Sequence, residues 1–238
     1  MFKEQISNDD DHVAEDHGAC GLSAVVNLDG KADNQTIRMV MEAGRRMEFR
    51  SGITEDDGGK IVGADGAGVL FDTKDKGQWM DMMSDRQKRR VHDPKDVQMS
   101  VVHFDRSLTE LDIAVRIEAI NESLHRRGLE FLDWEKLVTN EEGIDERRLP
   151  RIPRYYKLTY QVPGVDHTQV DAVKAYRVAR RINSKVDRVK LASMAMDRVA
   201  FKGVLTGTEL MKFFPILNQI GARAAISHVR YSTNVVTD

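Results

Sequence analysis

Cysteine is nearly missing from this chain, whose 238 residues include only Cys20. A single thiol cannot close an internal disulfide, so the composition fits a reducing compartment and we expect a cytoplasmic protein. One cysteine also excludes zinc and iron–sulfur sites that take several cysteine ligands from the same chain. The seven histidines include no pair at metal-ligand spacing, so the sequence predicts no metal site.

Long apolar runs and a strong charge of one sign are missing as well. No run approaches the roughly 18 apolar residues of a membrane-spanning helix. The net charge of −2 provides no general basic field for nucleic acid or an anionic membrane. Residues 1–19 are acidic and resemble neither a secretory nor a mitochondrial signal. With 41% hydrophobic and 31% charged residues, the composition is that of a folded domain.

Apolar periodicity and turn residues predict strands and helices that do not alternate regularly. We expect strands at 20–28, 69–71, 101–104, 128–137, 149–162, 189–196, 198–205 and 222–234. Helices are expected at 36–49, 168–186 and 208–217, and another between a Ser107–Glu110 capping box and Gly128. This order favours an α+β fold over a regular βαβ alternation.

Finer details follow from the same patterns. Thr206 and Glu209 have the spacing of a capping box for the helix at 208–217. The glycine-rich segment 58–68 is expected to be a loop, and it is no P-loop because no Gly-Lys-Ser/Thr follows. The side chains expected to face inward from helix 168–186 are Val173, Tyr176, Ala179, Ile182 and Val186.

Three polar clusters are candidates for chemistry. They are Cys20 with its small neighbours, Arg50 within MEFRSG, and the group His228, Arg230 and 232–234 within SHVRYSTN. Each also has a plain structural interpretation. A lone cysteine is most often a small buried hydrophobe, and SHVRYSTN alone is typical of a strand end with a capped turn.

Taken together, six segments carry a resemblance to a known family. In chain order they are HGACGLSAVVNLDGK, MEFRSG, GADGAGVLF, GLEFLDWEKL, FKGVLTGTEL and SHVRYSTN. With them the sequence resembles the N-terminal glutaminase domain of the glutamate synthase large subunit. That domain is a type II glutamine amidotransferase of the N-terminal-nucleophile hydrolase superfamily.

The resemblance implies a fold and a domain organisation. The fold is an α+β, four-layer αββα sandwich. Residues 1–19 then correspond to an acidic propeptide-like extension, and residues 20–238 to the amidotransferase domain. The family's oxyanion-hole Asn-Gly pair has no counterpart, because no Asn-Gly dipeptide occurs in this sequence. We therefore expect the first part of such a domain, either a fragment truncated before its final strands or a subunit completed by another polypeptide, with little or no activity by itself.

The resemblance also assigns roles to individual residues. Cys20 is the nucleophile, and it has a neighbouring base only if cleavage after Ala19 frees its α-amino group. Arg230 holds the α-carboxylate of glutamine, a task suited to a planar bidentate donor. Ser232 and Thr233 support that pocket, and Arg50 supports the nucleophile. The role of Arg50 is the least direct, because its family neighbours are a histidine and a glycine where this chain has Phe49 and Ser51.

Cofactors and partners follow by the same resemblance. Ammonia from glutamine would pass to 2-oxoglutarate on a synthase region that carries FMN and an iron–sulfur cluster, and no cofactor is expected in this chain. Two alternatives stay open. The chain could serve as a stand-alone amidotransferase for another acceptor, or as a non-catalytic regulatory or binding module that retains the fold.

Overall fold

The structure, a computed structural model, describes residues 20–47, 53–55, 61–64, 66–163 and 169–230. Most of the strands in this part of the chain form two four-stranded antiparallel sheets. The first sheet has the strand order β1 (Gly21–Val26), β10 (Ala224–Arg230), β4 (Gly66–Asp72) and β9 (Arg198–Gly203). The second has the order β6 (Glu130–Lys136), β7 (Arg154–Gln161), β5 (Val97–Phe104) and β8 (Val189–Leu191). Strands β2 (Ile53–Glu55) and β3 (Ile61–Ala64) form a separate pair.

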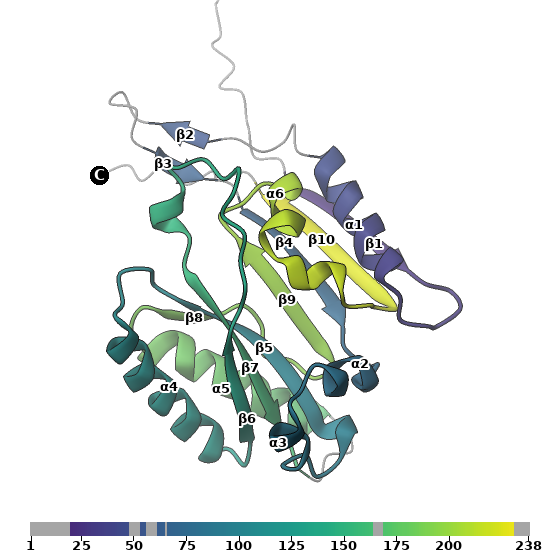
Figure 1. The fold of residues 1–238 in the computed structure, drawn as a ribbon, viewed down its shortest axis with the longest axis vertical. Coiled ribbons are helices and arrows are strands. Elements are labelled where there is room, and N and C mark those ends of the chain that lie inside the picture. Colours follow the sequence, from purple (N-terminus) through teal and green to yellow (C-terminus); the bar gives the residue numbers. More distant parts are fainter. Residues whose placement is uncertain (1–19, 48–52, 56–60, 65, 164–168, 231–238) are drawn as a thin grey trace, which may run out of the picture.

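Helices cover the two sheets from opposite sides (Figure 1). Helix α1 (Asn34–Arg46) packs on β1 and β10, and α6 (Gly207–Phe213) contacts α1 and β4. On the other side, α5 (Gln169–Lys185) contacts β8, and α4 (Glu110–His125) contacts β6. The short helices are α2 (Lys76–Asp81), α3 (Asp85–Lys88), η2 (Pro94–Asp96), η3 (Leu149–Arg151) and η4 (Pro215–Asn218). The α+β class and the αββα sandwich are confirmed. No helix in the described ranges is both long and apolar enough to cross a membrane.

Two glycines let α1 and α6 approach their neighbours closely. Ile37 and Val40 of α1 are fully buried against the first sheet. A Cβ on Gly44 would lie 2.6 Å from the Ser227 Oγ of β10, and one on Gly207 would lie 3.0 Å from the Gly44 backbone. Both values are below ordinary van der Waals contact, so glycine is required where helix meets strand and where helix meets helix.

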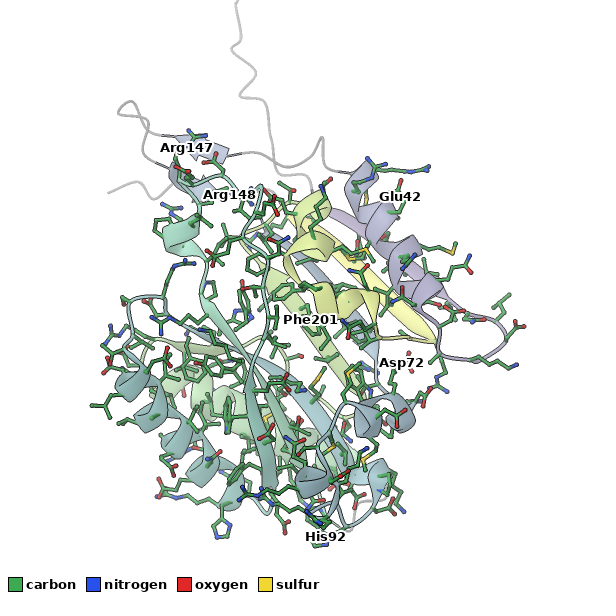
Figure 2. The ribbon with its side chains drawn as sticks, in the orientation of Figure 1. Glu42, Asp72, His92, Arg147, Arg148 and Phe201 are labelled. Atoms are coloured by element: carbon green, nitrogen blue, oxygen red, sulfur yellow. The ribbon has the colours of Figure 1, made fainter. Side chains whose placement is uncertain are left out.

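An aromatic cluster joins the first sheet to the second. Phe201 of β9 lies near the middle of the molecule (Figure 2), with its ring centroid 5.9 Å from Phe71 and 5.2 Å from Phe214. Phe214 in turn packs edge-on against Tyr155 of β7 at 4.8 Å. Because each of these rings is almost completely buried, the cluster holds β9 and the end of α6 against the second sheet.

Asp72 ties the end of β4 to the start of β10. Its carboxylate accepts hydrogen bonds from the backbone N–H groups of Arg223 and Ala224 at 2.7 and 2.9 Å, and from Arg223 Nε at 3.0 Å. Partial burial alone would raise the pKa of Asp72, but these hydrogen bonds and the nearby guanidinium outweigh it and lower the pKa. The ionised carboxylate therefore stabilises the register between the two strands.

The structure corrects three details of the sequence interpretation. Helix α4 begins two residues later than predicted, with Thr109 and Asp112 forming the capping box. Gly66 and Gly68, which were expected in a loop, belong to strand β4. In α5, Val173 and Tyr176 are 45% and 62% exposed. The buried face of α5 instead runs through Ala175, Val178 and Ile182. The Thr206–Glu209 capping box of α6 is confirmed.

Candidate functional site

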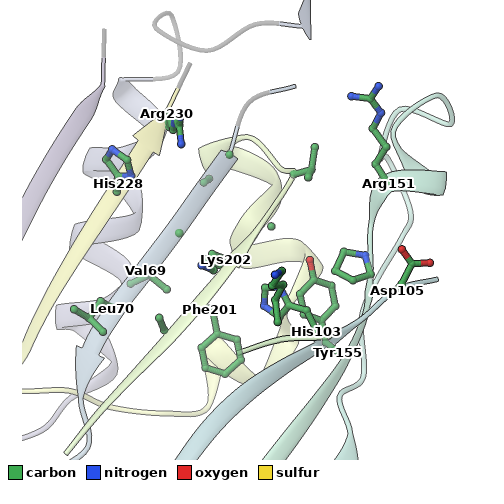
Figure 3. A pocket seen from close by; sticks show the side chains of 18 of the residues that line it. Val69, Leu70, His103, Asp105, Arg151, Tyr155, Phe201, Lys202, His228 and Arg230 are labelled. Carbon is green, nitrogen blue, oxygen red and sulfur yellow. The ribbon is translucent and has the colours of Figure 1, made fainter. Parts of the chain in front are cut away.

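A cleft of about 990 Å³ lies beside the first sheet, between strands β10, β4 and β9 and the facing part of the second sheet (Figure 3). Arg230 and His228 come from β10, and Lys202 comes from β9. Arg151 and Asp105 come from the opposite wall, and His103 and Tyr155 from the second sheet. The cleft is therefore built from segments that are far apart in the sequence.

The register explains why these side chains share one face. His228 lies opposite Gly68, and Gly68 lies opposite Lys202. Directly paired residues of antiparallel strands project to the same side, so His228 and Lys202 flank a position that has no side chain. The glycine that was expected in a loop thus makes room on this face of the sheet.

Cys20 and Arg230 occupy the same end of the first sheet. Gly21 pairs with Val229, so Cys20 and Arg230 are the next residues along these neighbouring strands. Leu22 pairs with His228, and because side chains alternate along a strand, Cys20 and Arg230 lie on the Leu22 face. Cys20 is a free, exposed cysteine. Arg230 pairs with Gly66 on its other side and lines the cleft.

The other residues assigned from the resemblance fall outside the described part of the chain. These are Arg50, Ser232 and Thr233. The structure thus brings Cys20 and Arg230 to the same end of the first sheet and leaves the positions of the other three open. In the described ranges, no group of three or more His, Cys, Asp or Glu side chains is placed to hold a metal ion.

The cleft carries an excess of positive charge that sequence reasoning did not find. Its cationic lining residues are Arg106, Arg151, Arg188, Lys190, Lys202 and Arg230, and its one lining carboxylate is Asp105. These cations come from five separate segments of the chain. The sequence gives little sign of this cluster of charge, because each cation lies beside an apolar strand or a polar turn that is ordinary by itself.

The half-buried His103 and the buried Tyr155 form the floor of the cleft. The His103 and Tyr155 rings pack edge-on with centroids 4.8 Å apart. Neither His103 Nε2 nor Tyr155 Oη has a hydrogen-bond partner among the described residues. Burial and the nearby Lys202 cation lower the pKa of His103 to about 3, and burial raises the pKa of Tyr155. Both groups are therefore neutral near pH 7, and the charge of the cleft comes from its lysines and arginines.

A buried ion pair anchors one wall of the cleft. Arg148, which is 3% exposed, precedes the segment that contributes Pro150 and Arg151 to the wall. Its Nη1 lies 2.9 and 2.8 Å from the two carboxylate oxygens of Glu209, and its Nη2 donates to the Val204 carbonyl at 2.8 Å. Because Glu209 also caps α6, the wall and that helix depend on the same carboxylate.

Comparison with known proteins shows the family to which this chain belongs. The family model for glutamine amidotransferases class-II matches residues 20–238, beginning at Cys20. The chain belongs to this family. It is 25% identical over 250 residues to a chloroplastic ferredoxin-dependent glutamate synthase of Spinacia oleracea, which covers 97% of this chain and 14% of that protein. The match to the NADPH glutamate synthase large chain of Azospirillum brasilense is 24% identical over 229 residues, covering 92% and 14%.

A third relative also matches nearly all of this chain and a small share of its own length. The ferredoxin-dependent glutamate synthase of Cyanidium caldarium is 23% identical over 229 residues, with 92% of this chain and 14% of that protein covered. The amidotransferase chain thus spans about one seventh of the length of these curated relatives.

Proposed function

We propose that this amidotransferase chain is the glutamine-hydrolysing domain of a glutamate synthase, with Cys20 as its nucleophile. The observation that carries the proposal is that Cys20 and Arg230 lie on one face at the same end of β1 and β10, where Arg230 lines the cleft. The start of the family match at residue 20 supports the same assignment. In this proposal residues 1–19 are removed and Cys20 becomes the first residue.

The α-amino group of Cys20 is the base in this mechanism. A free α-amino group has a pKa of roughly 7.7–8.0, so near neutral pH it takes the thiol proton readily. The thiolate attacks the δ-carbonyl carbon of glutamine, and the carbonyl electron pair moves onto oxygen. When the oxyanion collapses, the C–N bond breaks and the nitrogen leaves as ammonia with the transferred proton. Water then attacks the γ-glutamyl thioester, which releases glutamate and restores the thiol.

Arg230 is the proposed clamp for the glutamine α-carboxylate. Its guanidinium is exposed at the cleft and has no ion-pair partner among the described residues. A planar fork of N–H donors binds a carboxylate with two parallel hydrogen bonds, which orients the substrate as well as holding it. Ser232, Thr233 and Arg50 complete the pocket in this proposal.

The acceptor chemistry belongs to the larger protein. In our proposal the ammonia reacts with 2-oxoglutarate on a synthase region, and that region holds the FMN and the iron–sulfur cluster. The single cysteine of this chain supports placing the cluster elsewhere, because iron–sulfur clusters are held by several cysteine thiolates. It also supports a reducing compartment, which we propose to be the cytoplasm.

The test combines processing with active-site labelling. Intact mass spectrometry of the natural gene product should show Cys20 as the first residue, and 6-diazo-5-oxonorleucine should modify Cys20. Cys20→Ala should abolish both the labelling and glutamate release. Arg230→Lys should bind glutamine more weakly, whereas Arg86→Lys on the exposed surface of α3 should behave as wild type. An active enzyme that retains residues 1–19, or label on another residue, would refute the proposal.

A further inference from the structure

Helices α4 and α5 form one layer of the molecule on which opposite charges are separated. The two helices contact each other and together cover the second sheet (Figure 1). Their inward side chains belong to one apolar core, whereas their outward side chains are exposed to solvent. A molecule that packs on this layer therefore meets the outward stripes of both helices at once.

The outward stripe of α4 is acidic and partly apolar. Leu111 and Val115 are 77% and 60% exposed, and the exposed Glu118 and Glu122 follow them at helical spacing. Glu122 also pairs with Arg126, which follows the helix. The helix contains four carboxylates and one arginine, so its formal charge is −3 with histidine neutral. Helix α4 therefore presents an acidic surface with an apolar patch in its first turns.

The outward stripe of α5 is basic and also begins with apolar residues. Val173 and Tyr176 are exposed, and the exposed Arg177, Arg180 and Arg181 follow them. Helix α5 contains five lysines and arginines and one aspartate, so its formal charge is +4. None of the three arginines has an ion-pair partner among the described residues. The positive charge of α5 is therefore not neutralised there, although the acidic α4 lies beside it.

The two helices run antiparallel, and a contact at one end sets their relative level. Arg116, in the first half of α4, donates from Nε to the carbonyl oxygen of Asp187 at 2.9 Å, just beyond the end of α5. Both helices rise about 1.5 Å per residue, so two residues further along α4 and two residues back along the chain, Glu118 lies level with Lys185 to within about one turn. In the same way, Glu122 lies level with the arginines of α5.

A second copy of the chain fits this arrangement through a two-fold axis parallel to the helices. Rotation about such an axis keeps each position along the helices and exchanges α4 with α5. The acidic stripe of each copy therefore lies on the basic stripe of the other, in two identical seams. Glu118 of one copy then faces Lys185 of the other. A purely acidic or a purely basic partner would match only one of the two stripes.

We propose that the outward faces of α4 and α5 form a self-complementary interface with a second copy of this chain. The 16 residues of α4 make the layer about 24 Å long, and two helices of about 10 Å diameter make it about 20 Å wide, so the two copies bury about 1,000 Å² together. This area is at the lower limit for a specific interface, so we expect a weak dimer with a micromolar dissociation constant. The interface involves neither Cys20 nor the cleft, so it holds or fails independently of the proposed catalytic function.

Charge reversal tests this interface by sedimentation equilibrium. The variant Arg180→Glu, Arg181→Glu makes both stripes acidic, and the variant Glu118→Lys, Glu122→Lys makes both stripes basic. Each variant should stay monomeric at concentrations at which the wild type dimerises, because like charges then face each other in both seams. An equimolar mixture of the two variants should form a mixed dimer, because both seams again join opposite charges.

A matched control reverses two charges elsewhere. The variant Arg86→Glu, Arg89→Glu changes two exposed arginines at α3 and should dimerise as the wild type does. Salt at about 0.5 M, where the Debye length is roughly 4 Å, should weaken the wild-type dimer several-fold. Circular dichroism shows whether each variant is folded.

A cross-link between chains tests the geometry in the wild type. A carbodiimide joins a carboxylate to an amine only when the two are in contact, and mass spectrometry identifies the linked peptides. In a mixture of ¹⁵N-labelled and unlabelled chains, we expect amides between Glu118 and Lys185 that join a labelled chain to an unlabelled one. Lys212, exposed on α6, is the control for unspecific reaction.

Four results would each overturn the proposal. The first is a wild type that stays monomeric throughout the concentration range, which would mean that another molecule or none binds this layer. The second is a dimer that survives both charge reversals. The third is a pair of monomeric, folded variants that do not associate when mixed. The fourth is a set of Glu118–Lys185 amides that are confined to single chains.

Discussion

The ion pair between Arg148 and Glu209 gives a quantitative test of how the cleft wall is held. We consider Glu209→Gln, which removes the negative charge and keeps a side-chain oxygen for the cap of α6. The Arg148 side chain is 4% exposed, and its Nε already has no partner among the described residues. Without the carboxylate, the guanidinium keeps one hydrogen bond, to the Val204 carbonyl. The substitution therefore leaves a buried charge without a counter-charge.

Breaking a buried pair by removing one partner costs about 3–5 kcal/mol. With urea slopes of roughly 1–3 kcal/mol per molar, this cost should lower the unfolding midpoint by about 1–5 M. The double variant Arg148→Met, Glu209→Gln should be more stable than Glu209→Gln alone, because it removes the stranded charge and fills the site with an apolar side chain. Circular dichroism and the fluorescence of the buried Trp79 report the transition.

The double-mutant cycle decides whether the pair acts as a unit. The two single variants and the double variant should show a coupling energy well above the few tenths of a kcal/mol seen for independent sites. A Glu209→Gln cost below about 1 kcal/mol, the range of exposed pairs, would refute the reasoning. Strict additivity of the two single-variant effects on the unfolding free energy would refute it as well, because the contribution of Arg148 would then not depend on the carboxylate of Glu209.

Three further predictions follow from the first sheet. Gly44→Ala should destabilise the fold by about 1–3 kcal/mol in urea unfolding, because the added Cβ overlaps Ser227 Oγ. Asp72→Asn should lower the unfolding free energy by about 1 kcal/mol at pH 7, since partial exposure screens its interaction with Arg223. The Asp72 pKa is lowered by folding, so this difference should be present above about pH 4 and disappear on further acidification. Arg230→Lys should raise KM for glutamine more than it changes kcat, which steady-state kinetics would show.

Local structure was the part of the fold that the sequence predicted best. The Thr206–Glu209 box needs residues three apart, and it caps α6 as expected. The Ser107–Glu110 pair has the same spacing, but Ser107 bonds to Asp105 and Glu110 pairs with Arg154. Local spacing allows a cap and does not exclude such competing partners. The partner of Ser107 is two positions away, and the partner of Glu110 is 44 positions away.

Burial faces and strand neighbours depend on contacts that are distant in the sequence. The pattern for α5 favoured Val173 and Tyr176 because they are large and apolar, but the residues of α5 that pack into the apolar core between the second sheet and its helices are Ala175 and Val178. The candidate site likewise contains residues that local motifs reveal and residues that only the pairing of distant strands reveals. Cys20 and Arg230 were found from their flanking motifs. Lys202 was not, because its position in the cleft depends on pairing with Gly68 of another strand.

The charge of the cleft also limits what it can contribute to the proposed reaction. Glutamine carries no net charge at neutral pH, so a cleft of net positive charge attracts it weakly, whereas the product glutamate carries −1 and is attracted more strongly. A field of six cations would therefore retain the product over the substrate. Selection of glutamine must come from directed hydrogen bonds, of the kind that one guanidinium at the end of β10 makes to an α-carboxylate. Arg230 and the diffuse charge of Lys190, Lys202 and their neighbours therefore have different tasks.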